Sequence, residues 1–136
     1  MEKLIAAMPK AELHLHLEGS IEPSTVVELA ARHGVALTPD EVKARYACSD
    51  FAGFIEAFKW VTSFLRAPAD YALITERLAE RLIAQNVLYA EVTLSIGVMF
   101  WRKQDARANF LAIAEAGRRA EKKGLKVCAQ IGRAHV

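Results

Sequence analysis

The segment from Glu12 to Glu18 alternates strictly between leucine and a charged or imidazole side chain. Alternation with a period of two is typical of a β-strand that has one apolar and one polar face. We therefore expect a strand over about residues 10–18. Its leucines would pack against covering elements. Its polar face, with Glu12, His14, His16 and Glu18, would look into the remaining space of the fold.

Two histidines separated by one residue on a strand place both imidazoles on the same side, within reach of one metal ion. Imidazole suits zinc, and a catalytic zinc ion normally has three or more protein ligands and one open position. His14 and His16 can supply two ligands, so the others must come from elsewhere in the fold. A bare H-x-H pattern also arises by chance. However, burying two imidazoles and two acids would be costly without a metal ion or a polar site.

The rest of the chain alternates between helical and strand patterns. We expect a lead-in helix over residues 1–8 and a loop over 97–102. Further helices are expected over about 23–34, 39–46, 50–66, 68–85 and 105–123, and further strands over 87–96 and 125–131. Connections of this length between strands imply parallel pairing and right-handed crossovers.

Each expected strand has one polar face, as in Tyr89, Glu91 and Thr93 or in Cys128 and Gln130. Strands of a doubly wound sheet are apolar on both faces, so this pattern favours a barrel whose interior holds a site. Such barrels need about 250 residues, and this chain has 136. The fold class we expect is α/β, the N-terminal part of a (β/α)8 TIM barrel that is truncated in its third strand.

The expected helix over residues 50–66 is unusually aromatic. Phe51, Phe54, Ile55 and Phe58 recur at helical spacing on one face. The simplest interpretation is a stripe that faces the core. The competing interpretation is a hydrophobic wall over a pocket, and the two can hold for different residues of the stripe.

Charge and composition exclude several classes of partner. The formal net charge is +2, from 18 basic and 16 acidic residues, which is too near balance to indicate nucleic acid or an anionic membrane surface. Cys48 and Cys128 form no C-x-x-C motif, and no apolar run approaches the ~20 residues of a membrane span. We expect a cytoplasmic protein, and its oligomeric state stays open.

The segment Pro9–Ser20 (PKAELHLHLEGS) resembles the N-terminal signature of the adenosine/adenine deaminase family of zinc-dependent amidohydrolases. The segments 50–58 and 86–92 also resemble this family. The resemblance implies a (β/α)8 barrel with zinc (Zn2+) at the C-terminal face, bound by His14 and His16. Two further ligands, the glutamate general acid and a second catalytic histidine would lie beyond residue 136, so no acid–base residue is expected within this chain.

The implied reaction is hydrolysis of a purine 6-amino group with release of ammonia. The resemblance assigns substrate contacts to His16 and Glu18, and it assigns a hydrophobic gate to Phe51, Phe54, Ile55 and Phe58. Adenosine-acting members usually have aspartate at the position of Glu18. Glutamate there resembles adenine deaminases and aminodeoxyfutalosine deaminases.

Two further departures leave the substrate beyond the 6-aminopurine open. Many members have arginine and proline where this chain has Thr93 and Ile96. The expected loop over 97–102 would lie at the pocket mouth and could read a different substituent on the purine.

Three other interpretations remain. A cupin also uses H-x-H but is all-β, which the long helices after Ser20 oppose. An amidohydrolase acting on an ester, lactam or phosphotriester would share the motif. A non-enzymatic interpretation is a catalytically dead partial barrel.

The last six residues, 131–136 (IGRAHV), coincide with the translation of a common sequencing-library adapter. We therefore expect a barrel domain over 1–130 followed by a non-native tail, and His135 is not a candidate ligand.

Overall fold

The computed structural model describes residues 1–132. Its strands are β1 (Lys10–His16), β2 (Val87–Leu94) and β3 (Lys126–Ile131). Its helices are α1 (Glu2–Ala7), α2 (Pro23–Arg32), α3 (Pro39–Tyr46), α4 (Phe51–Thr62), α5 (Pro68–Ala84), α6 (Ile96–Trp101) and α7 (Ala106–Glu121), with a 3₁₀ turn, η1, over Glu18–Ser20. The expected order of helices and strands is confirmed. The expected loop over 97–102 is wrong, because α6 fills most of it.

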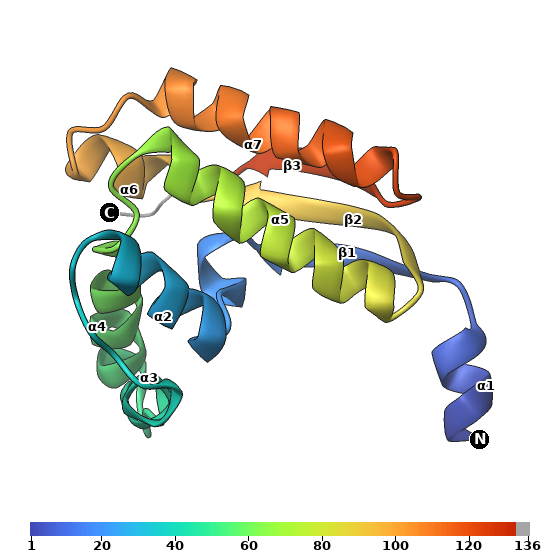
Figure 1. The fold of residues 1–136 in the computed structure, drawn as a ribbon, viewed down its shortest axis with the longest axis horizontal. Helices are drawn as coiled ribbons and strands as arrows, with labels where there is room; N and C mark the ends of the chain where they lie inside the picture. The colour runs from blue at the N-terminus through green and yellow to red at the C-terminus, as the bar shows by residue number, and fades with distance from the viewer. Residues whose placement is uncertain (133–136) are drawn as a thin grey trace.

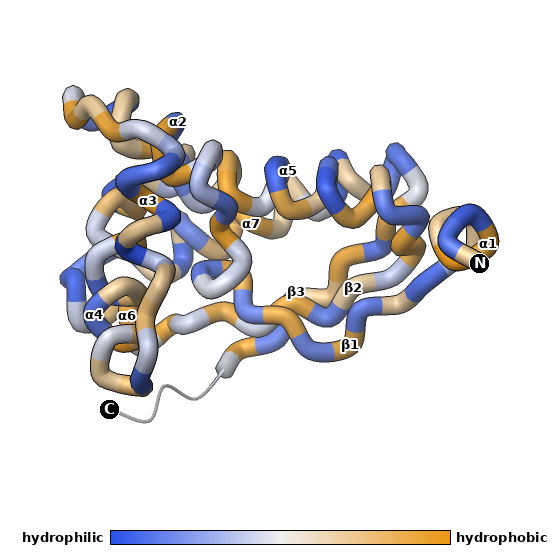
Figure 2. Tube along the Cα trace, turned by 90° about the horizontal axis from the view of Figure 1, so that it is seen from below, coloured by the Kyte–Doolittle hydropathy of each residue, from blue (hydrophilic) through white to orange (hydrophobic). Residues whose placement is uncertain are grey.

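The three strands form one parallel sheet in the order β1-β2-β3. Helices α5 and α7 connect successive strands and lie side by side over one face of this sheet (Figure 1). In the view from below, α5 and α7 form one layer and the strands form another (Figure 2). Helices α2, α3 and α4 gather at the end of the sheet where β1 and β2 terminate (Figure 1).

The predicted polar faces of β2 and β3 lie side by side. The register pairs Glu91 with Cys128 and Thr93 with Gln130, and paired residues of parallel strands project to the same face. The Gln130 side-chain amide donates to Glu91 at 2.9 Å. A shared polar face across two strands confirms the pattern that favoured a barrel interior over a sheet covered on both sides.

Strand β1 departs from the strict alternation expected of it. Glu12 pairs with Ala90 and Leu15 pairs with Val92, so β1 has one extra residue between two pairing positions. Such a bulge shifts the faces by one position. Glu12 consequently shares the face of the fully buried Ala90 and does not share the face of Thr93. Its expected place beside His14 and His16 is wrong.

Two leucines predicted to be covered are exposed. Leu13 of β1 is 62% exposed and Leu88 of β2 is 50% exposed. The bulge at Leu13 removes this residue from the regular alternation, and β1 lies at the edge of the sheet. Leu88 is the second residue of β2, and the register with β1 skips it, because Lys10 pairs with Val87 and Ala11 pairs with Tyr89.

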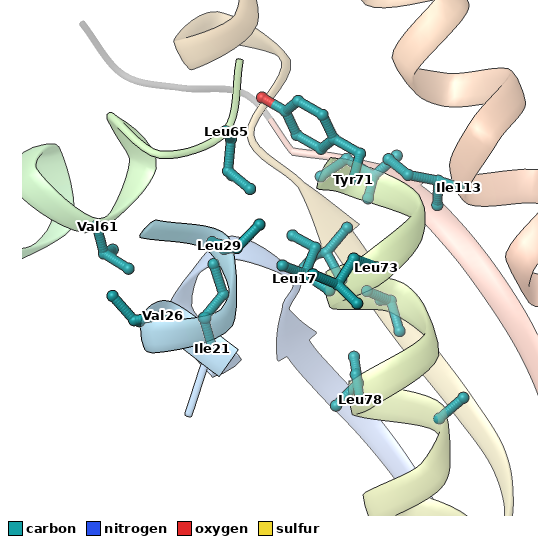
Figure 3. Close-up of a cluster of buried hydrophobic side chains, with 14 of the residues drawn as sticks. Leu17, Ile21, Val26, Leu29, Val61, Leu65, Tyr71, Leu73, Leu78 and Ile113 are labelled. Carbon is teal, nitrogen blue, oxygen red and sulfur yellow. The ribbon is translucent and has the colours of Figure 1, made fainter. Parts of the chain in front are cut away.

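The apolar core lies where the end of β1 meets α2, α4 and α5. Leu17 and Leu29 are fully buried there, with Val26, Leu65 and Tyr71 (Figure 3). Burying a leucine side chain stabilises the fold by about 1.5–3 kcal/mol. The core therefore fixes α2, α4 and α5 around the residues that follow β1.

The predicted helix ends are confirmed at several positions. Thr38 forms the capping box at the start of α3, accepting from the Glu41 N–H at 3.3 Å while its own N–H donates to the Glu41 carboxylate at 2.7 Å. Gly34 and Gly124, which follow α2 and α7, have φ of +73° and +95°, as expected of glycine after a helix. Within residues 1–132 no helix is long and apolar enough to cross a membrane.

The expected tail falls mostly beyond the described part of the chain. Ile131 is the last residue of β3, and the Gly132 N–H donates to the Leu94 carbonyl at 3.1 Å. Residues 133–136 lie outside the described residues. The non-native origin of residues 131–136, and the domain boundary at residue 130, stay predictions.

Candidate active site

The two histidines of the H-x-H motif lie at the carboxyl end of β1. Their rings are 5.2 Å apart between centroids and meet edge-on at 79°. Both side chains are exposed. His16 pairs with Thr93 of β2, so its ring belongs to the polar face of the sheet. The strand thus presents two neighbouring imidazoles at the end where parallel barrels carry their chemistry.

A cavity of about 490 Å³ opens beside these rings. Its lining joins the end of β1 and the turn η1 to one face of α4, and it consists of His14, Leu15, His16, Gly19, Ser20, Phe54, Ile55 and Phe58. The volume falls within the range typical of small-molecule sites. The structure therefore brings five of the seven predicted site residues to one cavity from segments almost 40 residues apart.

Helix α4 has two apolar faces with different surroundings. Phe54 and Phe58 line the cavity, whereas Ala57 and Val61 are buried in the core on the other side. Phe51 is 77% exposed, lies outside the cavity lining and stacks on Phe54 with a centroid separation of 6.3 Å. The core-facing interpretation of the stripe is wrong for Phe51 and Phe54, and the interpretation as a wall over a pocket describes Phe54 and Phe58.

Both ends of α4 are held by polar contacts. At its start the Asp50 carboxylate accepts from the Gly53 N–H at 2.7 Å. Near its end Arg102, which follows α6, donates to the Lys59 carbonyl at 2.7 Å and to the Thr62 hydroxyl at 3.3 Å. Capping aspartates and charged donors of this kind stabilise helix ends. The sequence contains a signal for the Asp50 cap, but none that predicts the contact from Arg102.

Glu18 lies away from the cavity lining. The chain turns at Leu17, whose backbone is helical, and Glu18 opens η1 with only 1% of its surface exposed. Its carboxylate accepts from the Ser95 N–H at 3.0 and 3.2 Å. Burial raises the pKa of this carboxyl, and the hydrogen bonds from Ser95 oppose the rise. A direct contact between Glu18 and a substrate stays a prediction.

The donor set of this cavity fits part of a zinc site. Neutral imidazole is a common zinc ligand, and His14 and His16 supply two from one strand. Within residues 1–132 no group of three or more histidine, cysteine, aspartate or glutamate side chains could hold a metal ion.

Comparison with known proteins agrees with this geometry. The sequence model of the adenosine deaminase family matches residues 9–132. An aminodeoxyfutalosine deaminase from Streptomyces avermitilis is 40% identical over 124 residues, which cover 89% of this chain and 35% of the relative. An adenine deaminase from Ralstonia nicotianae is 42% identical over 91 residues, covering 65% of this chain and 26% of the relative.

Solved structures show the same fold. An adenine deaminase from Arthrobacter aurescens superposes with a TM-score of 0.84 at 26% identity, covering 92% of this chain and 39% of that chain. An amidohydrolase from Burkholderia ambifaria, solved with bound zinc, superposes with a TM-score of 0.79 at 27% identity. The match covers 93% of this chain and 36% of that chain. The chain spans about a third of the length of these proteins. Its three parallel strands are consistent with the predicted N-terminal part of a TIM barrel.

The family model covers the H-x-H strand, the aromatic helix and all three strands of the sheet. The chain belongs to the adenosine deaminase family.

Proposed function

We propose that the protein containing this chain is a zinc-dependent hydrolytic deaminase that converts a 6-aminopurine to the 6-oxopurine and releases ammonia. The observation that carries this proposal is the cavity that joins the two imidazoles of β1 to the aromatic face of α4. It is supported by the deaminases among the relatives and by the zinc in one solved structure.

In this proposal His14 and His16 hold the metal ion from one side. Zinc in such a site supplies a hydrolytic nucleophile at neutral pH by acidifying water. His16 also contacts the substrate. The remaining ligands and the acid–base residues come from the rest of the protein, so the 136-residue chain by itself has no deaminase activity.

The aromatic face of α4 is suited to the flat purine ring. Phe54 and Phe58 stack on one another with a centroid separation of 6.3 Å and line the cavity together with Ile55. Apolar side chains beside a metal site bind the base and exclude water from the reacting carbon. Phe51, which stacks on Phe54 outside the cavity lining, extends this wall and gates entry in our proposal.

Among 6-aminopurine substrates, we propose adenine or aminodeoxyfutalosine over adenosine. The two relatives described above are named aminodeoxyfutalosine deaminase and adenine deaminase. Glu18 occupies the position at which adenosine-acting members usually have aspartate. A change of about one bond length in a tight site alters catalysis strongly, so Glu18→Asp is expected to move the kcat/KM ratio toward adenosine.

The test uses the complete reading frame, expressed with zinc supplementation. Ammonia release is measured with adenine, aminodeoxyfutalosine and adenosine, and metal content is measured on the same preparation. Stoichiometric zinc and turnover that His16→Ala abolishes would support the proposal. A well-folded protein that binds zinc and releases ammonia from none of the three would refute it, and strong preference for adenosine would refute the assignment of substrate.

A further inference from the structure

The most deeply buried acid at the candidate site has no place in the cavity lining. Glu18 is 1% exposed, and a carboxylate taken out of water is costly unless hydrogen bonds compensate. Both of its oxygens lie within hydrogen-bonding distance of one donor, the Ser95 N–H, at 3.0 and 3.2 Å. The Ser95 N–H is therefore one of the groups that compensate for the burial of Glu18, and it is the one that ties Glu18 to the end of β2.

Ser95 lies at the junction between β2 and α6. It follows the last residue of β2 and precedes the first residue of α6. Two residues earlier, the Thr93 carbonyl accepts from the Leu17 N–H at 3.0 Å. Successive contacts from Leu17 and Glu18 thus join the end of β1 to the end of β2, beyond the regular ladder of the sheet.

The same turn forms the floor of the cavity. Gly19 and Ser20 follow Glu18 in η1, and both line the cavity beside His14 and His16. The Ser20 hydroxyl donates back to the Leu17 carbonyl at 2.9 Å. Any displacement of Glu18 moves these two residues, because they belong to one tight turn.

We propose that Glu18 is a positioning residue that locks the Gly19–Ser20 floor to the end of β2 through Ser95. This inference rests on the proposed deaminase function, and it gives Glu18 an indirect role in substrate binding. Within the described residues the cavity lining contains no aspartate or glutamate. With Glu18 engaged by Ser95, the floor offers no carboxylate to a sugar hydroxyl.

The length of the side chain is decisive for this lock. Aspartate is shorter by one methylene, about 1.5 Å, and cannot reach the Ser95 N–H unless the backbone moves. Glutamine keeps the length and one acceptor oxygen but has no charge. Glu18→Asp therefore tests the length of the side chain at constant charge, and Glu18→Gln tests its charge at constant length.

The first measurement is hydrogen exchange of the Ser95 amide, read at single-residue resolution in the full-length protein. A hydrogen bond to a charged group protects its donor, and its loss accelerates exchange by about 10- to 100-fold. We expect that acceleration in Glu18→Asp and a much smaller one in Glu18→Gln. Glu22→Asp is the matched control, because Glu22 lies in the same connection and pairs with Arg81 on the surface. It is expected to leave Ser95 exchange unchanged.

The second measurement is steady-state kinetics with the best substrate. A displaced floor weakens binding, so KM is expected to rise about tenfold in Glu18→Asp with a smaller change in kcat, and to rise less in Glu18→Gln, while the surface control Glu22→Asp stays near wild type. Equal Ser95 protection in wild type and Glu18→Asp would overturn the lock. An unprotected Ser95 with unchanged KM would overturn the positioning role. A defect in Glu18→Gln as large as that in Glu18→Asp would overturn the claim that the length of the side chain is decisive.

These outcomes are separable from failure of the proposed function. A full-length protein without deaminase activity would refute the function, and the exchange of Ser95 would still decide whether the lock exists.

Discussion

The buried carboxylate of Asp70 gives the sharpest test of what holds the helices around the end of β1 together. Asp70 is 3% exposed in the first turn of α5. It accepts from the Arg66 N–H at 2.9 Å and the Ala67 N–H at 3.0 Å, and it contacts His33 Nε2 at 3.0 Å. One side chain thus joins the end of α2, the segment between α4 and α5, and the start of α5.

Replacement of Asp70 by alanine leaves all three of these donors without their partner. A hydrogen bond to a charged group contributes about 1.5–3 kcal/mol, and loss of a helix cap costs about 1 kcal/mol. These contributions overlap. We expect Asp70→Ala to lower the free energy of unfolding by about 3–5 kcal/mol, because several hydrogen bonds to one buried carboxylate are lost together. Asp70→Asn keeps one acceptor oxygen, so its free energy of unfolding is expected to lie between those of Asp70→Ala and wild type.

Asp40 supplies the matched control on α3. It also lies in the first turn of its helix, but its side chain is 90% exposed, and among residues 1–132 its one side-chain ion pair is with Lys43, at 3.0 Å. Exposed pairs contribute about 0–1 kcal/mol. The assay is equilibrium urea unfolding of the full-length variants. Their free energies of unfolding are compared only where the m-value, the slope of that free energy against urea concentration, is unchanged. If Asp70→Ala destabilises the protein no more than Asp40→Ala does, the reasoning from burial is refuted.

Four further predictions follow from the site and its surroundings. His16→Ala is expected to reduce zinc content at least tenfold in the full-length protein, and retained stoichiometric zinc would contradict the ligand assignment. Phe54→Ala is expected to raise KM with little loss of stability, whereas Leu65→Ala, which truncates a fully buried side chain, is expected to cost about 2–5 kcal/mol; equal stability of the two variants in urea would contradict this. Hydrogen bonds from Thr38 hold the pKa of Glu41 below its usual range. Wild type is therefore expected to be more stable than Glu41→Gln at neutral pH, and this difference is lost as pH falls through the folded pKa of Glu41. A difference independent of pH would refute that. The 136-residue chain expressed alone is expected to aggregate through its unpaired strand edges, and a monodisperse monomer with a cooperative melt would show otherwise.

The periodicity of the sequence was sufficient for the order of elements and for the parallel sheet. Proline and capping signals placed the start of α3 at Pro39 and that of α5 at Pro68. The polar faces of β2 and β3 were also predictable, because the pairing of the two strands is regular from Tyr89 and Lys126 onward. These features depend on local pattern, which the sequence displays directly.

The bulge in β1 was not predictable from the pattern. Leucine and polar residues alternate through it unbroken, and nothing in Leu13 or His14 indicates an extra residue. A bulge depends on the register with the neighbouring strand. The position of Glu18 was also not predictable from the pattern. The sequence continues to alternate from His14 through His16 to Glu18, although the backbone turns to helical geometry at Leu17.

The role of α4 shows most clearly what periodicity leaves undecided. An apolar stripe identifies a face that avoids water, but α4 has such a face toward the core, through Ala57 and Val61, and a second toward the cavity, through Phe54 and Phe58. Large aromatic side chains on the cavity side are costly to expose to water unless a ligand or another segment covers them. Their exposure beside two imidazoles is therefore a stronger indication of a binding site than the aromatic stripe itself, because an exposed apolar wall and two polar ring side chains meet at one cavity.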